Sequence, residues 1–167
     1  MRIESFAPIV NDKSSVLILG TMPSVTSLKL GEYYGHRDNI FWDLIFRICK
    51  PDWRCDELVD VAYTEKVKLV LENGIAIWDV LQFCERRGNL DRNIRNQIHN
   101  DFKNFFREYP SIKKVFFNGL EPAKYFEDFN GISEIFEGRT FKTLQSSSPS
   151  NSTNSFYILR QWGEILN

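Results

Sequence analysis

The stretch YYGHRDNIFW, from Tyr33 to Trp42, brings flat aromatic rings together with polar groups that can donate and accept hydrogen bonds. Its centre is too polar for a core strand, and its flanks are too aromatic for an ordinary solvated loop. Asn39 either caps the helix that follows or presents its amide to a bound group. His36 either pins the loop through hydrogen bonds or takes part in catalysis. The stretch is therefore a candidate binding or catalytic loop.

Four short apolar runs predict the strands that must position such a loop. They are SVLILG (15–20), GIAIWDVL (74–81), KKVFFNG (113–119) and RTFKTLQ (139–145). Residues 21–38 are expected to form a long loop. Helices are expected over 39–50 and 63–73, through Phe102 and Phe106, from 121, and after 154. This alternation predicts the α/β class, as one domain over residues 1–167. The architecture would be a single-domain three-layer α/β/α sandwich around a central, mostly parallel four-stranded sheet.

Polar residues follow each of the four expected strands. In a parallel sheet, ligands bind beyond the carboxyl ends of the strands. GTMPS (20–24), Asp79, Asn118 and SSSPSN (146–151) all fall at such ends. Asp79 could instead cap a loop, Asn118 could form a turn with Gly119, and the serine-rich segment could be a flexible linker. The sequence therefore predicts a binding site at this edge and leaves the part of each segment open.

Composition narrows the classes of protein. Hydrophobic residues make up 43% of the chain and aromatic residues 14%, which argues against disorder. No apolar run approaches the roughly 20 residues of a membrane helix, and the amino terminus lacks the apolar centre of a signal peptide. We expect a soluble, cytoplasmic protein with no membrane partner.

Charge and cysteine content exclude two further classes. A net charge of −1 does not suit a generally cationic nucleic-acid binder, so any contact with DNA needs local basic patches. Arg86, Arg87, Arg92 and Arg95 are candidates, although they could equally form a solvated face. The cysteines, at 49, 55 and 84, lack the pairing and spacing of a disulfide framework or metal site. We expect no metal and no cofactor.

Taken in order, these segments resemble the uracil-DNA glycosylase superfamily. GTMPS resembles its first motif, a Gly-x-x-Pro turn, and SPSN (148–151) resembles the Pro-Ser loop of its second motif. YYGHRDNIFWDLI (33–45) resembles the aromatic-x-His-Pro-x-Asn-x-Phe-Trp pattern of the mismatch-specific glycosylases. Together with WDVL (78–81) and CERRGNLD (84–91), the sequence is most similar to the hypoxanthine-DNA (deoxyinosine) glycosylase branch. The resemblance covers most of the chain.

The resemblance implies a DNA repair enzyme. It would hydrolyse the N-glycosidic bond of a flipped-out deaminated base, hypoxanthine and/or uracil, and leave an abasic site. Met22 stands where relatives place an Asn or Asp in the first motif, and a thioether cannot orient water. Catalysis would therefore fall to Asn39, as in the hypoxanthine branch.

The resemblance also implies which residues hold the base. Tyr34 matches the position that stacks on it, and Asp79 the position that reads its pairing edge. Asn118 is a second candidate reader. Backbone N–H groups of the turn, including those of Thr21 and Met22, would face the base.

DNA containing deaminated bases is the implied partner, bound by a monomer. The serine-proline loop (Ser148, Pro149, Ser150, Asn151) and the basic pair Arg86 and Arg87 would contact its backbone. Two departures from the pattern matter: Arg37 replaces the usual proline, and Ser148 stands where some relatives carry an imidazole. No lysine is placed for lyase chemistry, so the enzyme is expected to be monofunctional.

Two alternatives remain. Because Met22 replaces the usual polar residue, the chain could be a non-catalytic nucleic-acid binding protein of the same fold. A nucleotide hydrolase is disfavoured, because neither a Gly-rich phosphate loop nor a carboxylate cluster for a metal is present.

Overall fold

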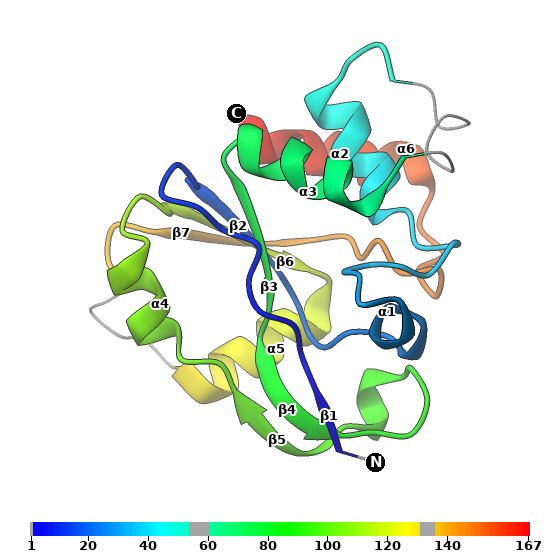
Figure 1. The fold of residues 1–167 in the computed structure, drawn as a ribbon, viewed down its shortest axis with the longest axis vertical. Coiled ribbons are helices and arrows are strands. Elements are labelled where there is room, and N and C mark those ends of the chain that lie inside the picture. The colour runs from blue at the N-terminus through cyan, green and yellow to red at the C-terminus, as the bar shows by residue number, and fades with distance from the viewer. Residues whose placement is uncertain (1, 54–60, 131–135) are drawn as a thin grey trace.

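The computed structural model describes residues 2–53, 61–130 and 136–167, and its centre is a parallel sheet (Figure 1). The sheet has the order β3-β2-β6-β7, with every neighbouring pair parallel. Its strands are β2 (Val16–Gly20), β3 (Ile75–Asp79), β6 (Lys114–Asn118) and β7 (Thr140–Leu144). Every residue of β2 is buried, which explains its uninterrupted apolar run. The four predicted strands and their parallel arrangement are confirmed.

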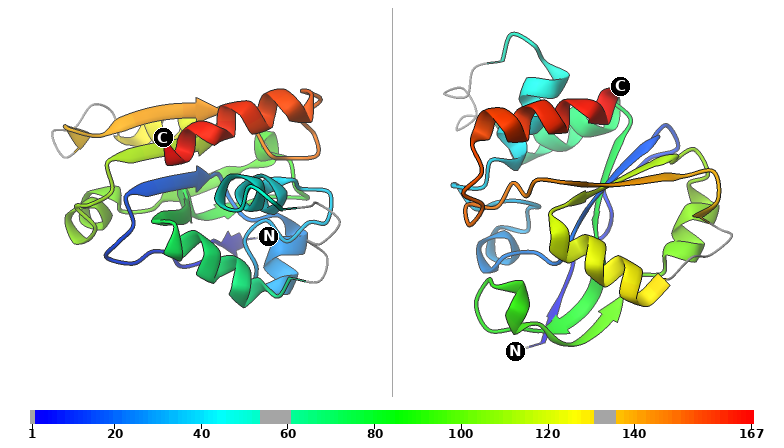
Figure 2. Two further views of the ribbon diagram at one scale, coloured as in Figure 1. Left: turned by 90° about the horizontal axis from the view of Figure 1, so that it is seen from above. Right: turned by 180° about the vertical axis from the view of Figure 1, so that it is seen from behind.

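Helices cover both faces of this sheet (Figures 1 and 2). On one face lie α2 (Phe41–Cys49), α3 (Tyr63–Glu72) and α6 (Ser155–Trp162), which η4 (Gly163–Leu166) extends. On the other lie α4 (Phe102–Glu108) and α5 (Leu120–Asn130). Side chains of β2 alternate between the two cores: Leu17 and Leu19 pack on the side of α4 and α5, and Val16 and Ile18 on the side of α2 and α6. The predicted three-layer α/β/α sandwich is confirmed.

A second sheet was not predicted. It is antiparallel, with the order β1-β4-β5, and consists of β1 (Arg2–Glu4), β4 (Leu81–Glu85) and β5 (Arg95–His99), with the short η2 (Asp91–Asn93) before β5. All of β5 lies at least partly exposed, so its sequence lacks the apolar alternation that marks a strand. Residues 84–96 therefore appeared only as a polar, basic segment.

The expected long loop over 21–38 is also corrected. It contains α1 (Val25–Leu30), which is six residues long. Ser24 caps it, since its hydroxyl accepts a hydrogen bond from the backbone N–H of Ser27, and Gly31 ends it in the left-handed conformation. A helix this short carries too few apolar positions to show a helical period.

Two of the three cysteines, Cys49 and Cys84, are free thiols, and Cys55 lies outside the described residues. Among the helices that the structure describes, none combines the length and apolar character needed to cross a membrane.

Candidate active site

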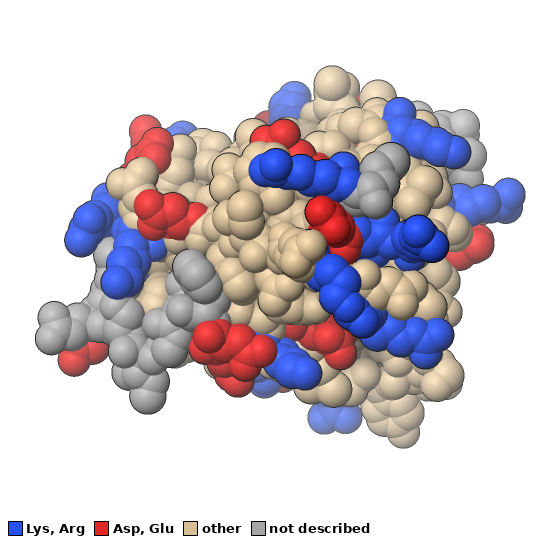
Figure 3. All heavy atoms as spheres, turned by 90° about the horizontal axis from the view of Figure 1, so that it is seen from below, with Lys and Arg blue, Asp and Glu red and all other residues tan. Residues whose placement is uncertain are grey.

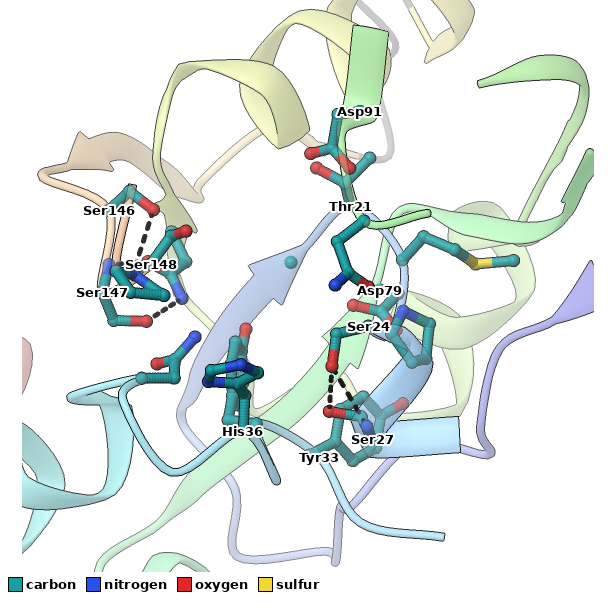
Figure 4. Close-up of a pocket in the computed structure, with 18 residues that line it drawn as sticks. Thr21, Ser24, Ser27, Tyr33, His36, Asp79, Asp91, Ser146, Ser147 and Ser148 are labelled. Carbon is teal, nitrogen blue, oxygen red and sulfur yellow. Dashed lines mark hydrogen bonds between the residues drawn. The ribbon is translucent and has the colours of Figure 1, made fainter. Parts of the chain in front are cut away.

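A cavity of about 210 Å³ lies at the carboxyl ends of β2, β3 and β6 (Figure 4). This is below the roughly 300–1,000 Å³ of pockets for drug-sized ligands, so it suits a single flat ring system better than a whole cofactor. Most residues predicted for the site line it: Thr21, Met22, Tyr34, Asn39, Asp79, Asn118, Ser148 and Pro149. Segments far apart in the sequence therefore meet at one place.

A wider groove of about 630 Å³ shares several lining residues with the cavity, among them Asp91, Asn118 and Ser148. The last two residues predicted from the serine-proline loop, Ser150 and Asn151, line this groove. The site thus continues from the cavity into the neighbouring groove.

Asp79 ends β3 and is only 3% exposed. Its Oδ2 accepts a hydrogen bond of 2.6 Å from the hydroxyl of Ser5. Burial raises the pKa of Asp79 to about 7, and the Ser5 hydroxyl partly offsets that rise. In Figure 4, Asp79 lies across the cavity from Ser146 and Ser147.

Ser5 was missed by sequence reasoning. The backbone N–H of Ser5 bonds the carbonyl of Gln82, and Ile9 pairs with Ile77 of β3, so the amino-terminal segment runs along β3. A contact across 74 positions leaves no local signal in the sequence.

Tyr34 has a φ of 54°, in the left-handed region that costs a non-glycine residue about 1–2 kcal/mol. Such strain is a pointer to function. One face of its ring stacks on Phe41, with centroids 3.7 Å apart and an angle of 12° between the planes. The ring is half-buried and also lines the cavity, so stacking on a base stays a prediction.

The hydroxyl of Tyr34 is buried and has no hydrogen-bond partner among the described residues. It lies beside Gly20, where an added Cβ would be 2.9 Å from the hydroxyl and 2.6 Å from Oδ1 of Asp79. Burial, and then the charge of Asp79, raise the pKa of Tyr34, and the nearby Asn118 amide offsets part of this rise. The hydroxyl is thus buried beside Gly20, Asp79 and Asn118 at the cavity floor.

Replacing Tyr34 with Phe is expected to raise the free energy of unfolding by about 1 kcal/mol, because it removes an unpaired buried hydroxyl. The stacked ring is kept, so the cavity should keep its shape. Urea unfolding of both proteins measures the difference. A loss of stability would show that the hydroxyl already has a partner in the free protein.

Asn39 lies one residue before Ile40, the N-cap of α2, and lines the cavity. Its Oδ1 accepts a hydrogen bond of 3.0 Å from the backbone N–H of Phe41, the first residue of α2. Its Nδ2 makes no hydrogen bond to the described residues, and Oδ1 keeps a second lone pair. The capping contact fixes the amide at the cavity wall, and a catalytic role stays a prediction.

Two neighbours of Asn39 hold the loop in place. Nδ1 of His36 accepts a hydrogen bond of 3.2 Å from the backbone N–H of Asp38, the pinning contact considered for this histidine. Tyr33 is 3% exposed, and its hydroxyl donates toward the carbonyls of Phe6 and Ala7. Tyr33 thus anchors the loop beneath the cavity.

Asn118 ties the end of β6 to the serine-proline loop. Its Nδ2 donates to the hydroxyl of Ser147 and its Oδ1 accepts from the N–H of Ser147, both at 2.8 Å. Gly119, at φ 108°, allows the close approach, since a Cβ there would lie 3.1 Å from Cβ of Ser146. Both polar atoms of the Asn118 amide thus already bond Ser147 of the loop. Recognition of a base by Asn118 stays a prediction.

The Gly-x-x-Pro turn rests on a core residue. The Met22 side chain is 8% exposed and packs in the core shared with α4 and α5. The backbone N–H groups of Met22 and Ser24 donate to no acceptor among the described residues. The backbone N–H of Thr21 likewise has no acceptor among the described residues, so the turn offers these N–H groups as free donors.

Arg86 requires a correction. It was predicted to contact DNA, but it is 5% exposed and cannot reach a phosphate. Its guanidinium donates to the carbonyl of Pro23 and lies 3.7 Å from Oδ1 of Asp91. Arg86 therefore supports the Gly-x-x-Pro turn from beneath.

Asp91 was also missed by sequence reasoning, although it lines the cavity. Burial raises its pKa, while a hydrogen bond from Thr21 and the charge of Arg86 partly offset the rise. Its sequence surroundings, GNLDRN, read as a polar turn without a chemical signal.

Arg87, in contrast, is exposed at the bend that follows β4. Seen from below, Lys and Arg side chains gather on the side of α1 and η2, with acidic side chains among them (Figure 3). Arg92 lines the open groove. Contact of these residues with DNA stays a prediction.

Comparison with known proteins gives the class. Residues 7–162 match the family described as the Uracil DNA glycosylase superfamily, and the chain belongs to it. The comparison therefore places the chain, and the site described above, in a family of DNA glycosylases.

Individual relatives show which members of the family the chain is similar to. The chain is 31% identical to a hypoxanthine DNA glycosylase of Methanosarcina barkeri, with 99% of each chain covered. It is 32% identical to a hypoxanthine DNA glycosylase of Methanosarcina acetivorans, with 96% of each covered. Its fold is similar to the solution NMR structure of a protein proposed to be a uracil DNA glycosylase from M. acetivorans, with a TM-score of 0.81 and 30% identity, covering 99% of this chain and 97% of that one.

Acidic side chains line the cavity, but the described residues contain no group of three His, Cys, Asp or Glu side chains arranged to hold a metal ion.

Proposed function

We propose that the protein is a monofunctional DNA glycosylase that hydrolyses the N-glycosidic bond of an extruded deaminated base, hypoxanthine and/or uracil, and leaves an abasic site. The observation that carries the proposal is the cavity itself, where Asn39, Tyr34 and Asp79 meet at the carboxyl edge of the sheet. The hypoxanthine DNA glycosylases to which the chain is similar support it over almost their whole length.

A base inside a duplex cannot be reached, so the nucleotide must first be extruded, which costs a few kcal/mol. Stacking of the base on Tyr34 returns roughly 1–3 kcal/mol of this. The carboxylate of Asp79, whose Oδ2 is already held by Ser5, then offers Oδ1 as an acceptor to the edge of the base. Binding thus uses the ring and the floor of the cavity together.

Bond cleavage leaves positive charge on the sugar and negative charge on the base. Asn39 holds the attacking water through its free Nδ2 and the spare lone pair of Oδ1. The unpaired N–H groups of Met22 and Ser24 stabilise the departing base. Replacement of the usual polar residue by Met22 therefore leaves the turn with backbone donors only.

Base release from defined duplexes tests the proposal. Duplexes carrying hypoxanthine, uracil or xanthine, and an undamaged one, are incubated with the protein and then cleaved with alkali. We expect release from a deaminated duplex, none from the undamaged one, and no strand cleavage before alkali. Tight binding without release would instead support the non-catalytic nucleic-acid binding protein.

Binding to DNA is expected to depend only weakly on salt, with a slope of log affinity of about 2–4, because few basic residues lie near the cavity. Arg87→Ala should lower the slope by about 0.9, the value for one neutralised phosphate. Titration of an abasic duplex at several salt concentrations measures both.

Arg86→Ala is the contrasting variant for the salt experiment. Because its guanidinium is buried, its replacement should lower stability and leave the slope unchanged in protein that remains folded. A slope that falls for Arg86 and not for Arg87 would contradict this assignment.

A further inference from the structure

The two oxygens of Asp79 have different environments. Oδ2 is taken by the hydroxyl of Ser5 at 2.6 Å. Oδ1 lies on the side of Gly20, where a Cβ would come within 2.6 Å of it. Gly20 lines the cavity and has no side chain, which lets Oδ1 and the hydroxyl of Tyr34 approach its backbone closely at the cavity floor. The carboxyl group is thus oriented from outside the cavity, by the amino-terminal segment.

We propose that Ser5 is a positioning residue that holds Asp79 as an ionised acceptor for the N–H on the pairing edge of the extruded base, and that this pair excludes adenine. The inference rests on the proposed function and adds how the enzyme would recognise the base that it releases. Ser5 acts only through Asp79.

Hydrogen-bond chemistry gives the discrimination. An ionised carboxylate only accepts, whereas a protonated one also donates. Hypoxanthine carries N1–H on its pairing edge, so N1–H can donate to Oδ1. Adenine carries a lone pair at N1, so this contact is lost and the lone pair faces the carboxylate instead. A protonated Asp79 could donate to N1 of adenine, and the pair would then stop discriminating.

The ionisation of Asp79 is finely balanced by its surroundings. Burial raises its pKa to about 7, the Ser5 hydroxyl lowers it, the charge of Asp91 raises it and that of Arg86 lowers it. The hydroxyls of Tyr33 and Tyr34 also lie near it, and both are kept neutral by burial. Loss of the Ser5 hydroxyl should therefore raise the pKa of Asp79 further, and ionisation would require higher pH.

The first part of the test follows the carboxyl carbon of Asp79 by NMR as pH is raised, in the free protein. Ser5→Ala should move its titration to higher pH, and Ser5→Thr, which keeps a hydroxyl, should restore it. Ser14→Ala is the matched control, since Ser14 is a buried serine at the opposite end of β2 that bonds Asn11. An unmoved titration in Ser5→Ala would overturn the inference, whatever the protein does to DNA.

The second part measures single-turnover release of hypoxanthine and of adenine between pH 6 and 9. For Ser5→Ala we expect hypoxanthine release about tenfold below that of the unmodified protein at pH 6 and less than twofold below it at pH 9, because a hydrogen bond to a charged group shifts a pKa by about one unit or more. Discrimination against adenine should grow with pH.

The two parts separate the two ideas. A shifted Asp79 titration with an unshifted pH profile would overturn the role in reading the base. No release by any variant would overturn the proposed function, while the NMR titration would still decide whether Ser5 controls Asp79.

Discussion

Replacement of Asn39 by Ala is expected to reduce base release by roughly two to three orders of magnitude, the usual effect of removing one well-placed polar group from an active site. Met22 leaves the Gly-x-x-Pro turn without a side chain that can orient water. Asn39 is the amide at the cavity wall whose Nδ2 remains unused. Single-turnover release from a hypoxanthine duplex measures the effect.

The capping bond complicates this variant, because its loss costs about 1 kcal/mol of stability whether or not Asn39 is catalytic. Asn154→Ala is the matched control. The Oδ1 of Asn154 caps α6 through the backbone N–H of Phe156 at 2.9 Å, and Asn154 does not line the cavity. Both variants should lose similar stability, and only Asn39→Ala should lose activity.

Asn39→Asp separates capping from catalysis in the other direction. A carboxylate still caps the helix, but it has no Nδ2 donors. We expect near-normal stability and poor base release. Full activity in folded Asn39→Ala protein would remove Asn39 from the mechanism.

Three strands of the parallel sheet, β2, β3 and β6, could be predicted from sequence because they are buried on both faces. VLILG of β2 is apolar throughout, and Asp79 and Asn118 stand at the carboxyl ends of β3 and β6. Since those ends share one edge, Asp79 and Asn118 could be placed beside the Gly-x-x-Pro turn before any coordinates were known. The prediction that these residues line one cavity therefore follows from the parallel arrangement of the strands.

Contacts between distant segments could not be predicted. Nothing in MRIESF indicates that Ser5 reaches Asp79, because the pairing of the amino-terminal segment with β3 and β4 sets that distance. Arg86 shows the same limit from the other side. In the sequence CERRGNLD, nothing distinguishes Arg86 from its neighbour Arg87. In the structure, Arg86 is buried and its guanidinium donates to the carbonyl of Pro23, whereas Arg87 is exposed. A run of charged residues in the sequence does not show which side chains are exposed, because exposure depends on how the folded chain packs around each of them.

Gly20→Ala is expected to lower base release by about two orders of magnitude while the fold persists. A methyl group there would lie 2.6 Å from Oδ1 of Asp79 and 2.9 Å from the hydroxyl of Tyr34, so both must move. Neither moves freely, because Asp79 is bonded to Ser5 and the ring of Tyr34 stacks on Phe41. Overpacking of this kind costs about 1–3 kcal/mol of stability, and a displacement of about 1 Å in an active site can cost 10²-fold in rate.

Gly163→Ala is the matched control for this glycine. Gly163 has helical geometry, with φ −57°, and an added Cβ would meet nothing within 4 Å. It should therefore retain both activity and stability. Thermal unfolding and single-turnover release of hypoxanthine, measured on both variants, separate a blocked cavity from a general effect of adding a methyl group.

The double variant Gly20→Ala with Tyr34→Phe locates the obstruction. Removing the hydroxyl relieves the 2.9 Å contact but not the 2.6 Å contact with Asp79. Stability should therefore recover in part. Base release should stay low, because the methyl group still displaces Asp79, whose Oδ1 is proposed to accept from the base. Undiminished release by Gly20→Ala alone would show that a displaced Asp79 does not impair release, and its proposed reading of the base edge would fail.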